Sequence, residues 1–438
     1  MRATTELFVP ELAERLAEQW GRGPHVYRGA LRAPALTERE FMAAILGTAA
    51  DYLADPGVKV PPGRVFLAGE VVKPEQLAAF LPRGDAEDCA QYVSRIRQAH
   101  PREEVGIILD NCEKHIGAVR DRLIPLLHGL FSRVGYPARQ NHACIYAGTY
   151  RTTPFGIHRD DCHVLMFCGV GKKRMAFWPR PYFDQTPEFF VGGKLRASVQ
   201  DHIAQATVLE IEPLDALYWS SDDWHVAVSD GDDFQASLSI GIYHHGSSTE
   251  KLLALDFLAA LARGGGLDLP GLPGAPDGQL DGSSLPTGPM AAFFQQWENL
   301  RDTLARPGEA EYRALTIALR LISSAGYGKL LAPRSAGDQA LDDGLLWCPV
   351  PQALVVARAR DGILVGANGS VFLYPRAAAA IEQTARGLRR GVPQRHADII
   401  AAVEHDARGA IASLLEDLVR CGALVVVPVD GSEAPAQR

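Results

Sequence analysis

Between residues 140 and 245, short apolar runs alternate with clusters of Gly, Pro, Asp and Ser. Each run is rich in β-branched and aromatic residues and is too short to form a stable helix alone, so it is predicted to be a strand. Many short strands separated by turns are typical of two sheets packed as a jelly roll. We therefore predict a mainly β core, a double-stranded β-helix. Its predicted strands are 141–148, 163–170, 173–179, 206–213, 215–221, 225–230 and 236–245.

Helical patterns flank this core on both sides. Apolar residues recur at helical spacing over 5–20, 37–54 and 113–134. Downstream of the core, the Gly- and Pro-rich segment 264–289 is typical of a linker or long loop, and 290–325 returns to helical spacing. Amphipathic helices that project from a barrel often pair subunits. A homodimer contact and simple packing onto the core are both open for them.

The C-terminal part has a different order of elements. From about residue 338 the pattern predicts two strands, three helices and a last strand, which suits a winged-helix-like α+β module. Residues 336–438 hold ten Lys and Arg against twelve Asp and Glu, the wrong sign for a typical DNA reader. We expect a structural or protein-contact role there and no nucleic acid. The predicted domains are 1–250, with the β core and its N-terminal helices, then 251–335, helical, and 336–438.

The composition is that of a globular chain in a reducing compartment. The 438 residues are 47% hydrophobic and carry a net charge of -8, which works against binding to nucleic acid or an anionic membrane. The seven cysteines are scattered and never form a CxxC pair, so neither a disulfide framework nor a cysteine zinc site is indicated. No signal peptide and no apolar run of about 20 residues is visible. We expect a cytoplasmic protein without a membrane partner.

One motif in the β region carries chemistry. His158 and Asp160 flank Arg159 between two predicted strands, and His225 follows within a later one. Two His and one carboxylate on one face of a barrel form a facial triad, which leaves positions on a non-haem iron open for other ligands. Residues two apart on a strand point to the same side, so His158 and Asp160 should converge. We predict that these three residues bind a metal ion.

Two accompaniments strengthen this prediction, because an HxD motif alone is common by chance. Lys173 begins the next predicted strand, where its ammonium group could pair with a carboxylate of a bound ligand. Aromatic residues also surround the motif and could keep water from a reactive centre; they are Phe155, Phe177, Trp178, Tyr218, Trp219 and Trp224.

At this point the sequence resembles a known family. Residues 146–178 are similar to the JmjC core of the ribosomal oxygenases, a branch of the cupin superfamily: they keep Tyr146, the Phe155-Gly156 pair, the HxD motif, Gly171 and Lys173. The family has Gly-Asp before the strand that leads to the second His. Here Leu214-Asp215 stands in its place, a departure that affects a turn and no ligand.

The resemblance implies an enzyme, a 2-oxoglutarate-dependent dioxygenase that uses Fe(II), 2-oxoglutarate and dioxygen. It implies that Lys173 binds the distal carboxylate of 2-oxoglutarate, that Tyr146 lines the same site, and that Ser237 or Ser239 adds a contact. The implied reaction is hydroxylation of a side chain in a protein or peptide, either a ribosomal protein or a natural-product precursor. In the family, a catalytic barrel is followed by a helical dimerisation segment and then by a winged helix, and the predicted domains of this chain have a similar order.

Three other functions remain open from the residues. The chain could be a catalytically inert cupin and winged-helix protein with a binding or regulatory role, although an intact triad with Lys173 argues against it. The same iron chemistry at an N-methyl group would make it a JmjC-type demethylase. A cupin isomerase or dioxygenase with another metal usually has three or more His ligands.

Neighbouring polar residues receive plainer interpretations. Asp161, Asp222 and Asp223 are candidates to hold the imidazoles, but each is more often a solvated turn acid. His163 should face away from His158. The remaining nearby candidates, His244, His245, Cys162 and Cys168, are interpreted as bystanders.

Overall fold

The structure is a computed structural model of the whole chain. It describes residues 7–54, 63–82, 84, 87–101, 103–137, 140–185, 190–191, 194–195, 197–229, 233–244, 309–327, 344–348 and 350–428. The predicted helix after residue 250 and the Gly/Pro-rich segment 264–289 therefore lie outside the described residues. None of the helices described is long and apolar enough to cross a bilayer.

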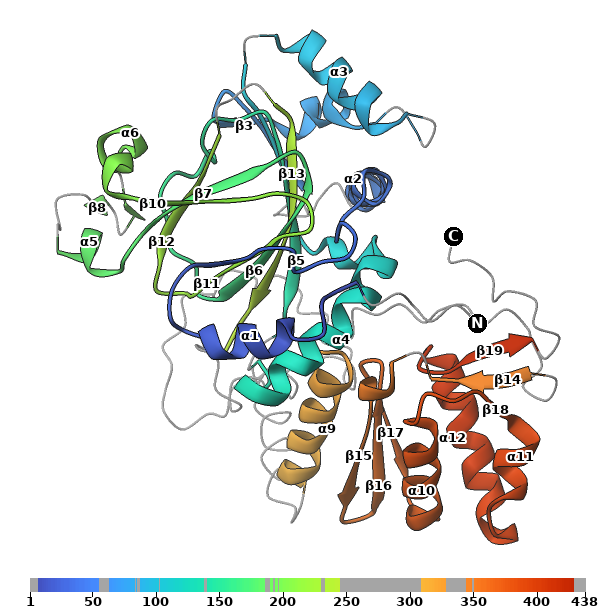
Figure 1. Cartoon of the computed structure of the whole chain (residues 1–438). Helices are drawn as coiled ribbons and strands as arrows, with labels where there is room; N and C mark the ends of the chain where they lie inside the picture. Colours follow the sequence, from blue (N-terminus) through green and yellow to red (C-terminus); the bar gives the residue numbers. More distant parts are fainter. Residues whose placement is uncertain are drawn as a thin grey trace, which may run out of the picture.

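Two antiparallel sheets face each other and form the core (Figure 1). Each run predicted as a strand between 141 and 245 contains a strand, so the sheet-rich core follows from the alternation of apolar runs and turns. The larger sheet has the order β1-β11-β6-β13-β5-β4-β2-β3 and the smaller one the order β10-β7-β12. The strands are β1 (His25–Tyr27), β2 (Gly63–Leu67), β3 (Glu70–Val71), β4 (Val105–Leu109), β5 (His142–Gly148), β6 (His163–Val170), β7 (Lys173–Trp178), β10 (Thr207–Ile211), β11 (Ala216–Trp219), β12 (Trp224–Val228) and β13 (Gln235–Ile242).

The strand registers decide which side chains share the space between the sheets. In the large sheet, Trp219 pairs with Val164, and Ser239 pairs with both Met166 and Cys144. Paired residues point to the same face, so each pairing is one rung of the inner wall. In the small sheet, β12 and β10 flank β7. The short strands β8 (Phe190–Val191) and β9 (Lys194–Leu195) form a separate hairpin.

Helices cover the outer face of the large sheet. Residues from them join one apolar cluster with the strands, including Leu16 of α1, Phe41 of α2 and Leu127 of α4. The main helices before residue 250 are α1 (Leu12–Gln19), α2 (Glu38–Ala54), α3 (Cys89–Ala99) and α4 (Gly117–Val134), with shorter turns at η1 (Pro74–Phe80), η2 (Cys112–Lys114), α5 (Pro181–Asp184), α6 (Val199–His202) and η4 (Ile203–Gln205). The first three predicted helical regions thus correspond to α1, α2 and α4.

The turn before β11 contains the Leu214-Asp215 pair. Leu214 adopts a φ of +83°, in the left-handed region that glycine enters without strain. The Asp215 carboxylate holds this turn, since it accepts hydrogen bonds from Gly29 N at 2.9 Å and from Glu212 N at 3.2 Å. The leucine therefore occupies a backbone conformation that is better suited to glycine.

A second core lies in the C-terminal part (Figure 1). It is built from two three-stranded sheets and three helices, and α9 (Glu309–Ser323) packs against β15, β16 and β17. The elements are β14 (Gly344–Trp347), η7 (Pro351–Ala353), β15 (Leu354–Ala359), β16 (Gly362–Ala367), β17 (Ser370–Tyr374), α10 (Ala378–Leu388), β18 (Gln394–Arg395), α11 (His396–Ala401), η8 (His405–Ala407), α12 (Arg408–Arg420) and β19 (Val425–Pro428). The predicted strands 353–359, 370–375 and 423–429 correspond to β15, β17 and β19, and the predicted helices 377–390, 396–405 and 410–421 correspond to α10, α11 and α12. The strands β14, β16 and β18 were not predicted. The winged-helix interpretation stays a prediction.

Candidate metal centre

Three polar side chains converge at one end of the space between the sheets. His225 lies on β12, and His158 forms an isolated antiparallel bridge with it, with His225 N donating to His158 O at 2.8 Å. Asp160 follows in the connection to β6. The HxD motif lies between strands, as expected: His158 is held by a single bridge to β12, and Asp160 follows two residues later, outside any regular strand.

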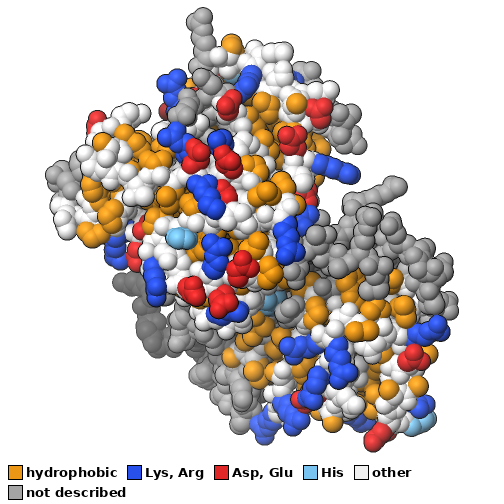
Figure 2. All heavy atoms as spheres, in the orientation of Figure 1, with side chains coloured by type: hydrophobic (Ala, Val, Ile, Leu, Met, Phe, Trp, Pro, Cys, Tyr) orange, Lys and Arg blue, Asp and Glu red, His pale blue; other side chains and the backbone are white. Residues whose placement is uncertain are grey.

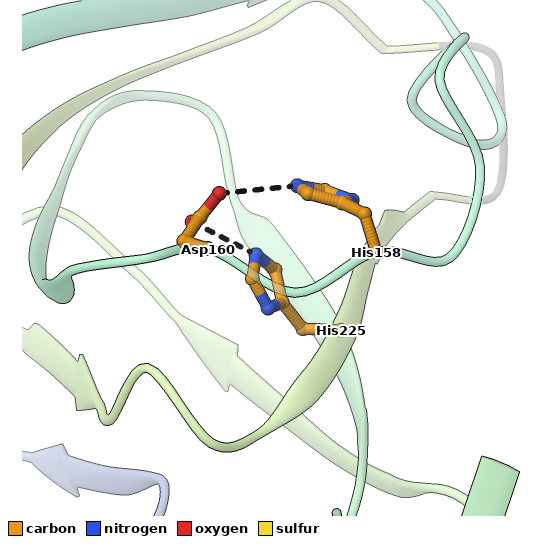
Figure 3. Close-up of side chains that lie close together, drawn as sticks. All are labelled: His158, Asp160 and His225. Carbon is orange, nitrogen blue, oxygen red and sulfur yellow. Dashed lines mark ion pairs between the residues drawn. The ribbon is translucent and has the colours of Figure 1, made fainter. Parts of the chain in front are cut away.

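The geometry of the three groups fits one metal ion (Figure 3). The Asp160 carboxylate faces both imidazoles, with Oδ2 3.3 Å from His225 Nε2 and Oδ1 3.8 Å from His158 Nε2. One ligand atom from each residue lies within 4.8 Å of the others. Among the described residues, this is the one group of three or more His, Cys, Asp and Glu that meets this condition.

Both imidazoles are held in the orientation that a metal needs. His158 Nδ1 lies 2.9 Å from Gly156 O, and His225 Nδ1 lies 3.0 Å from Asp223 O. A carbonyl oxygen only accepts, so each Nδ1 carries a hydrogen, and in a neutral imidazole each Nε2 then keeps a lone pair for a metal ion. Backbone carbonyls thus hold both imidazoles at Nδ1, a role for which the side chains of Asp161, Asp222 and Asp223 were only candidates.

The protonation states also suit a metal. Burial, together with the adjacent His225, lowers the pKa of His158 to about 4. Burial by itself would raise the pKa of Asp160, but the hydrogen bond and charge of His225 and the charge of His158 outweigh it and bring this pKa to about 2. At neutral pH the imidazole of His158 is neutral and the carboxylate is ionised, the forms that bind metal ions.

A cavity of about 90 Å³ extends from the triad between the sheets. Of the expected aromatic residues, Phe155 and Trp219 line it. The other residues of its wall are His142, Cys144, Tyr146, Thr153, Asp161, Cys162, Val164, Met166, Lys173, Met175, Ala227, Ser239, Gly241 and Tyr243.

Lys173 provides the cation of this cavity. Its side chain is 1% exposed, and its Nζ lies 2.7 Å from the Tyr150 hydroxyl, which is buried beside it. Among the described residues no carboxylate forms an ion pair with it. Burial lowers the pKa of Lys173 to about 7. An ammonium group that lines a cavity without a neighbouring carboxylate is suited to an anionic ligand.

The two serines of β13 have different surroundings. Ser239 lines the cavity, and its hydroxyl is buried without a hydrogen-bond partner among the described residues. Ser237 does not line the cavity, and its hydroxyl donates to Tyr146 O at 3.4 Å. Tyr146 itself is part of the wall. The geometry therefore favours Ser239 of the pair that the sequence left open.

Several residues of the cavity or next to it were not singled out from the sequence. Tyr150, which lies beyond the end of β5, is not in the cavity wall but contacts Lys173 behind it. His142 and Tyr243 lie at the ends of paired strands, with their polar atoms 3.1 Å apart. Alternation along β5 and β13 could have identified these two, since His142 and Tyr243 share the parity of Tyr146 and Ser239.

The other polar candidates have local partners. His163 lies in the aromatic core, with Nδ1 2.8 Å from the Tyr218 hydroxyl and its ring stacked on Trp20, so it faces away from the triad as expected. The carboxylate of Asp223 accepts from Ser220, and Asp222 pairs with Arg180. His245 lies outside the described residues.

Comparisons with known proteins find similarity among solved structures alone. No family model and no curated protein matches the chain. The chain is similar to YcfD of Escherichia coli at 15% identity and a TM-score of 0.49, over 96% of this chain and 99% of that one. A structure of YcfD described as a ribosomal oxygenase in complex with cobalt and 2-oxoglutarate is 14% identical, with a TM-score of 0.47 and the same coverage.

Proposed function

We propose that this chain is an Fe(II)- and 2-oxoglutarate-dependent oxygenase. The observation that carries the proposal is one cavity with two His and one Asp at one end and a buried lysine in its wall. The triad accounts for a metal, and Lys173 accounts for an anionic co-substrate. An inert binding protein would have no need for a metal triad and a buried lysine in the same cavity.

The donor set fits iron. Two neutral imidazole nitrogens and one carboxylate form the facial triad of non-haem Fe(II) oxygenases and leave positions for further ligands. A structural zinc site, by contrast, is usually closed by four protein ligands, often with cysteine. Cys162 lines the cavity, but it is not among the grouped ligand atoms. His158, Asp160 and His225 would therefore hold the iron.

The rest of the cavity fits a 2-oxo dicarboxylate. The Lys173 ammonium would pair with the distal carboxylate, and the Tyr150 hydroxyl keeps that ammonium in place. The Ser239 hydroxyl and the Tyr146 side chain would complete this part of the wall. An acid without the distal carboxylate would leave Lys173 buried and unpaired, which selects against it.

When bound, iron supplies oxidation of 2-oxoglutarate by dioxygen to succinate and CO2, with one oxygen atom passing into a C–H bond of the substrate. The protein residues orient and protect this reaction. The carbonyls of Gly156 and Asp223 fix the two imidazoles. Phe155 packs edge-on against His158 with ring centroids 4.6 Å apart, and with Trp219 it limits the access of water.

We further propose that the substrate is an amino-acid side chain in a protein or peptide. The solved structures with a similar fold include one described as a ribosomal oxygenase, so a ribosomal protein is the first candidate and a natural-product precursor peptide the second. Demethylation at an N-methyl group is the alternative reaction, and it would release formaldehyde. On the face shown in Figure 2, acidic and basic side chains are mixed over the barrel, so that face offers no field of one sign to a polyanion.

The organisation of the chain belongs to the same proposal. We propose an oxygenase domain over 1–250, a helical segment over 251–335 that pairs subunits, and a winged-helix-like module over 336–438. The dimer contact concerns residues that lie mostly outside the described ranges.

The test is succinate formation from 2-oxoglutarate by the Fe(II)-loaded protein. We expect slow, metal-dependent turnover by the wild type without substrate. Asp160→Ala and His225→Ala should reduce it by at least a hundredfold, because each removes a ligand. A wild type that neither binds 2-oxoglutarate nor forms succinate contradicts the proposal. Co-expressed ribosomal proteins or peptides that gain 16 mass units would identify the substrate.

A further inference from the structure

The indole N–H of Trp219 is a buried donor without an acceptor among the described residues. Trp219 is 2% exposed and lines the cavity. The indoles of Trp178, Trp224 and Trp347 instead donate to backbone carbonyls, those of His202, Arg180 and Gly391, at 3.0–3.2 Å. Buried polar groups in native proteins nearly always have a partner. Like the Ser239 hydroxyl in the same wall, this donor therefore points to a ligand.

The indole lies at the metal end of the cavity. Its ring centroid is 5.0 Å from that of His225 and 5.6 Å from that of Phe177. Phe177 pairs with His225 across β7 and β12, whereas Lys173 begins β7. At about 3.3 Å per residue, the Lys173 backbone is roughly 13 Å further along the strand. Trp219 and Lys173 therefore serve different ends of a bound molecule.

The indole is also fixed in place. Trp219 ends β11, where its backbone pairs with Val164 of β6, and its ring packs between two other rings. An indole nitrogen donates and never accepts, so its partner must be an acceptor, such as an oxygen of a bound acid. A hydrogen bond to an ionised acceptor is stronger than one to a neutral group.

We propose that Trp219 donates its indole N–H to an oxygen of the 2-oxo acid at the end that binds the metal. This inference rests on the proposed function and adds a ligand-binding residue to it. It divides recognition between two groups: Trp219 recognises the 2-oxo carboxylate end, which all 2-oxo acids share, and Lys173 recognises the distal carboxylate.

The test compares two acids under anaerobic conditions. Isothermal titration calorimetry of the Fe(II)-loaded protein gives dissociation constants for 2-oxoglutarate and for 2-oxobutyrate, which lacks the distal carboxylate. Trp219→Phe keeps an aromatic ring and removes the donor, so both acids should bind about tenfold more weakly, by the same factor. Lys173→Met should weaken 2-oxoglutarate alone. Trp178→Phe, which removes an indole donor outside the cavity, is the matched control and should change neither.

The outcomes distinguish a failure of the Trp219 assignment from a failure of the proposed oxygenase function. If the wild type binds neither acid, the proposed function fails. If the wild type binds both and Trp219→Phe leaves both constants unchanged, or weakens 2-oxoglutarate alone, the assignment of Trp219 is overturned and the function stands. A second measurement uses the wild type alone: with Zn(II) in the site, the indole proton of Trp219 should move downfield in NMR spectra on addition of either acid. An unmoved resonance overturns the inference.

Discussion

Lys173 is an unusual lysine because its ammonium group is buried and donates a hydrogen bond to the phenol of Tyr150. Burial lowers its pKa to about 7, so near neutral pH part of the free protein carries a neutral amine. A carboxylate pairs with the protonated form only. Binding of a dicarboxylate should therefore take up protons near neutral pH.

The first prediction concerns the pH dependence of 2-oxoglutarate binding. Affinity should be highest below pH 7 and fall as the pH rises above 7, by up to tenfold per pH unit, because the protonated fraction of Lys173 falls. The Lys173→Arg variant keeps its charge at all these pH values and should show a flat profile. The measurement is the dissociation constant of the metal-loaded protein between pH 6 and 9. A wild-type profile as flat as that of the arginine variant would remove Lys173 from the binding site.

At the level of residues, the sequence predicted the polar groups whose spacing is diagnostic. One cavity is lined by all four of these residues, namely His158, Asp160, His225 and Lys173. The contacts that the sequence did not reveal depend on the third dimension. Tyr150 meets Lys173 from a loop, and the imidazoles are held by backbone carbonyls, which carry no sequence signal.

At the level of elements, backbone strain can be tested at the turn before β11. Leu214 has a positive φ and is 38% exposed, so its side chain contributes little packing. Leu214→Gly should raise the free energy of unfolding by about 1 kcal/mol, because glycine adopts this conformation without strain. Leu214→Ala retains the Cβ and should give no such gain. Chemical denaturation measures both, and equal stability of the two variants would show that the turn is unstrained.

The element η2 allows a second test, which concerns a buried carboxyl group. Glu113 is buried there, and its Oε2 accepts from Ala143 N of β5 at 2.9 Å. Burial raises its pKa to about 7, above the ordinary value of 4.5. An acid with a raised pKa contributes stability that is full below pH 4.5 and is lost as the pH rises through 7.

Replacement of Glu113 by Gln should therefore stabilise the fold in a pH-dependent way. At pH 8 the free energy of unfolding should rise by roughly 1–3 kcal/mol, since no buried carboxylate has to be ionised, and at pH 5 the gain should be much smaller. Thermal unfolding at the two pH values measures the difference. A gain of the same size at both would mean that Glu113 is not the titrating group.

Strands without a clear alternation of apolar and polar residues were the hardest elements to predict from the sequence. The alternation of runs and turns predicted β5 to β7 and β10 to β13, but β4 is a short run buried at every position, which periodicity cannot distinguish from part of a helix. It pairs with β2 and β5, and this pairing extends the large sheet toward the N-terminus. Pairing between distant segments determines whether such a short run forms a strand, and a short stretch of sequence does not reveal this pairing.

At the level of the whole molecule, the turn after α9 connects the two cores. Asn141, just before β5, donates its backbone N–H to Gly326 O at 2.8 Å and its side-chain amide to Ala325 O at 3.0 Å. At the end of α9, the Ser323 hydroxyl accepts from Gly369 N in the turn between β16 and β17. The turn after α9 thus lies against the first strand of the cavity wall, and α9 itself lies on the C-terminal sheet (Figure 1). Such contacts join side chains to distant backbone, so the sequence alone could not predict them.

The central claim is that His158, Asp160 and His225 form one iron site that admits 2-oxoglutarate. Its most direct test is anaerobic equilibrium binding of Fe(II), followed by 2-oxoglutarate, to the wild type, Asp160→Ala and Asp161→Ala. We predict one Fe(II) per chain for the wild type and for Asp161→Ala, at least a hundredfold weaker binding for Asp160→Ala, and binding of 2-oxoglutarate only where iron is bound. Equal Fe(II) affinity in the wild type and Asp160→Ala would contradict the account.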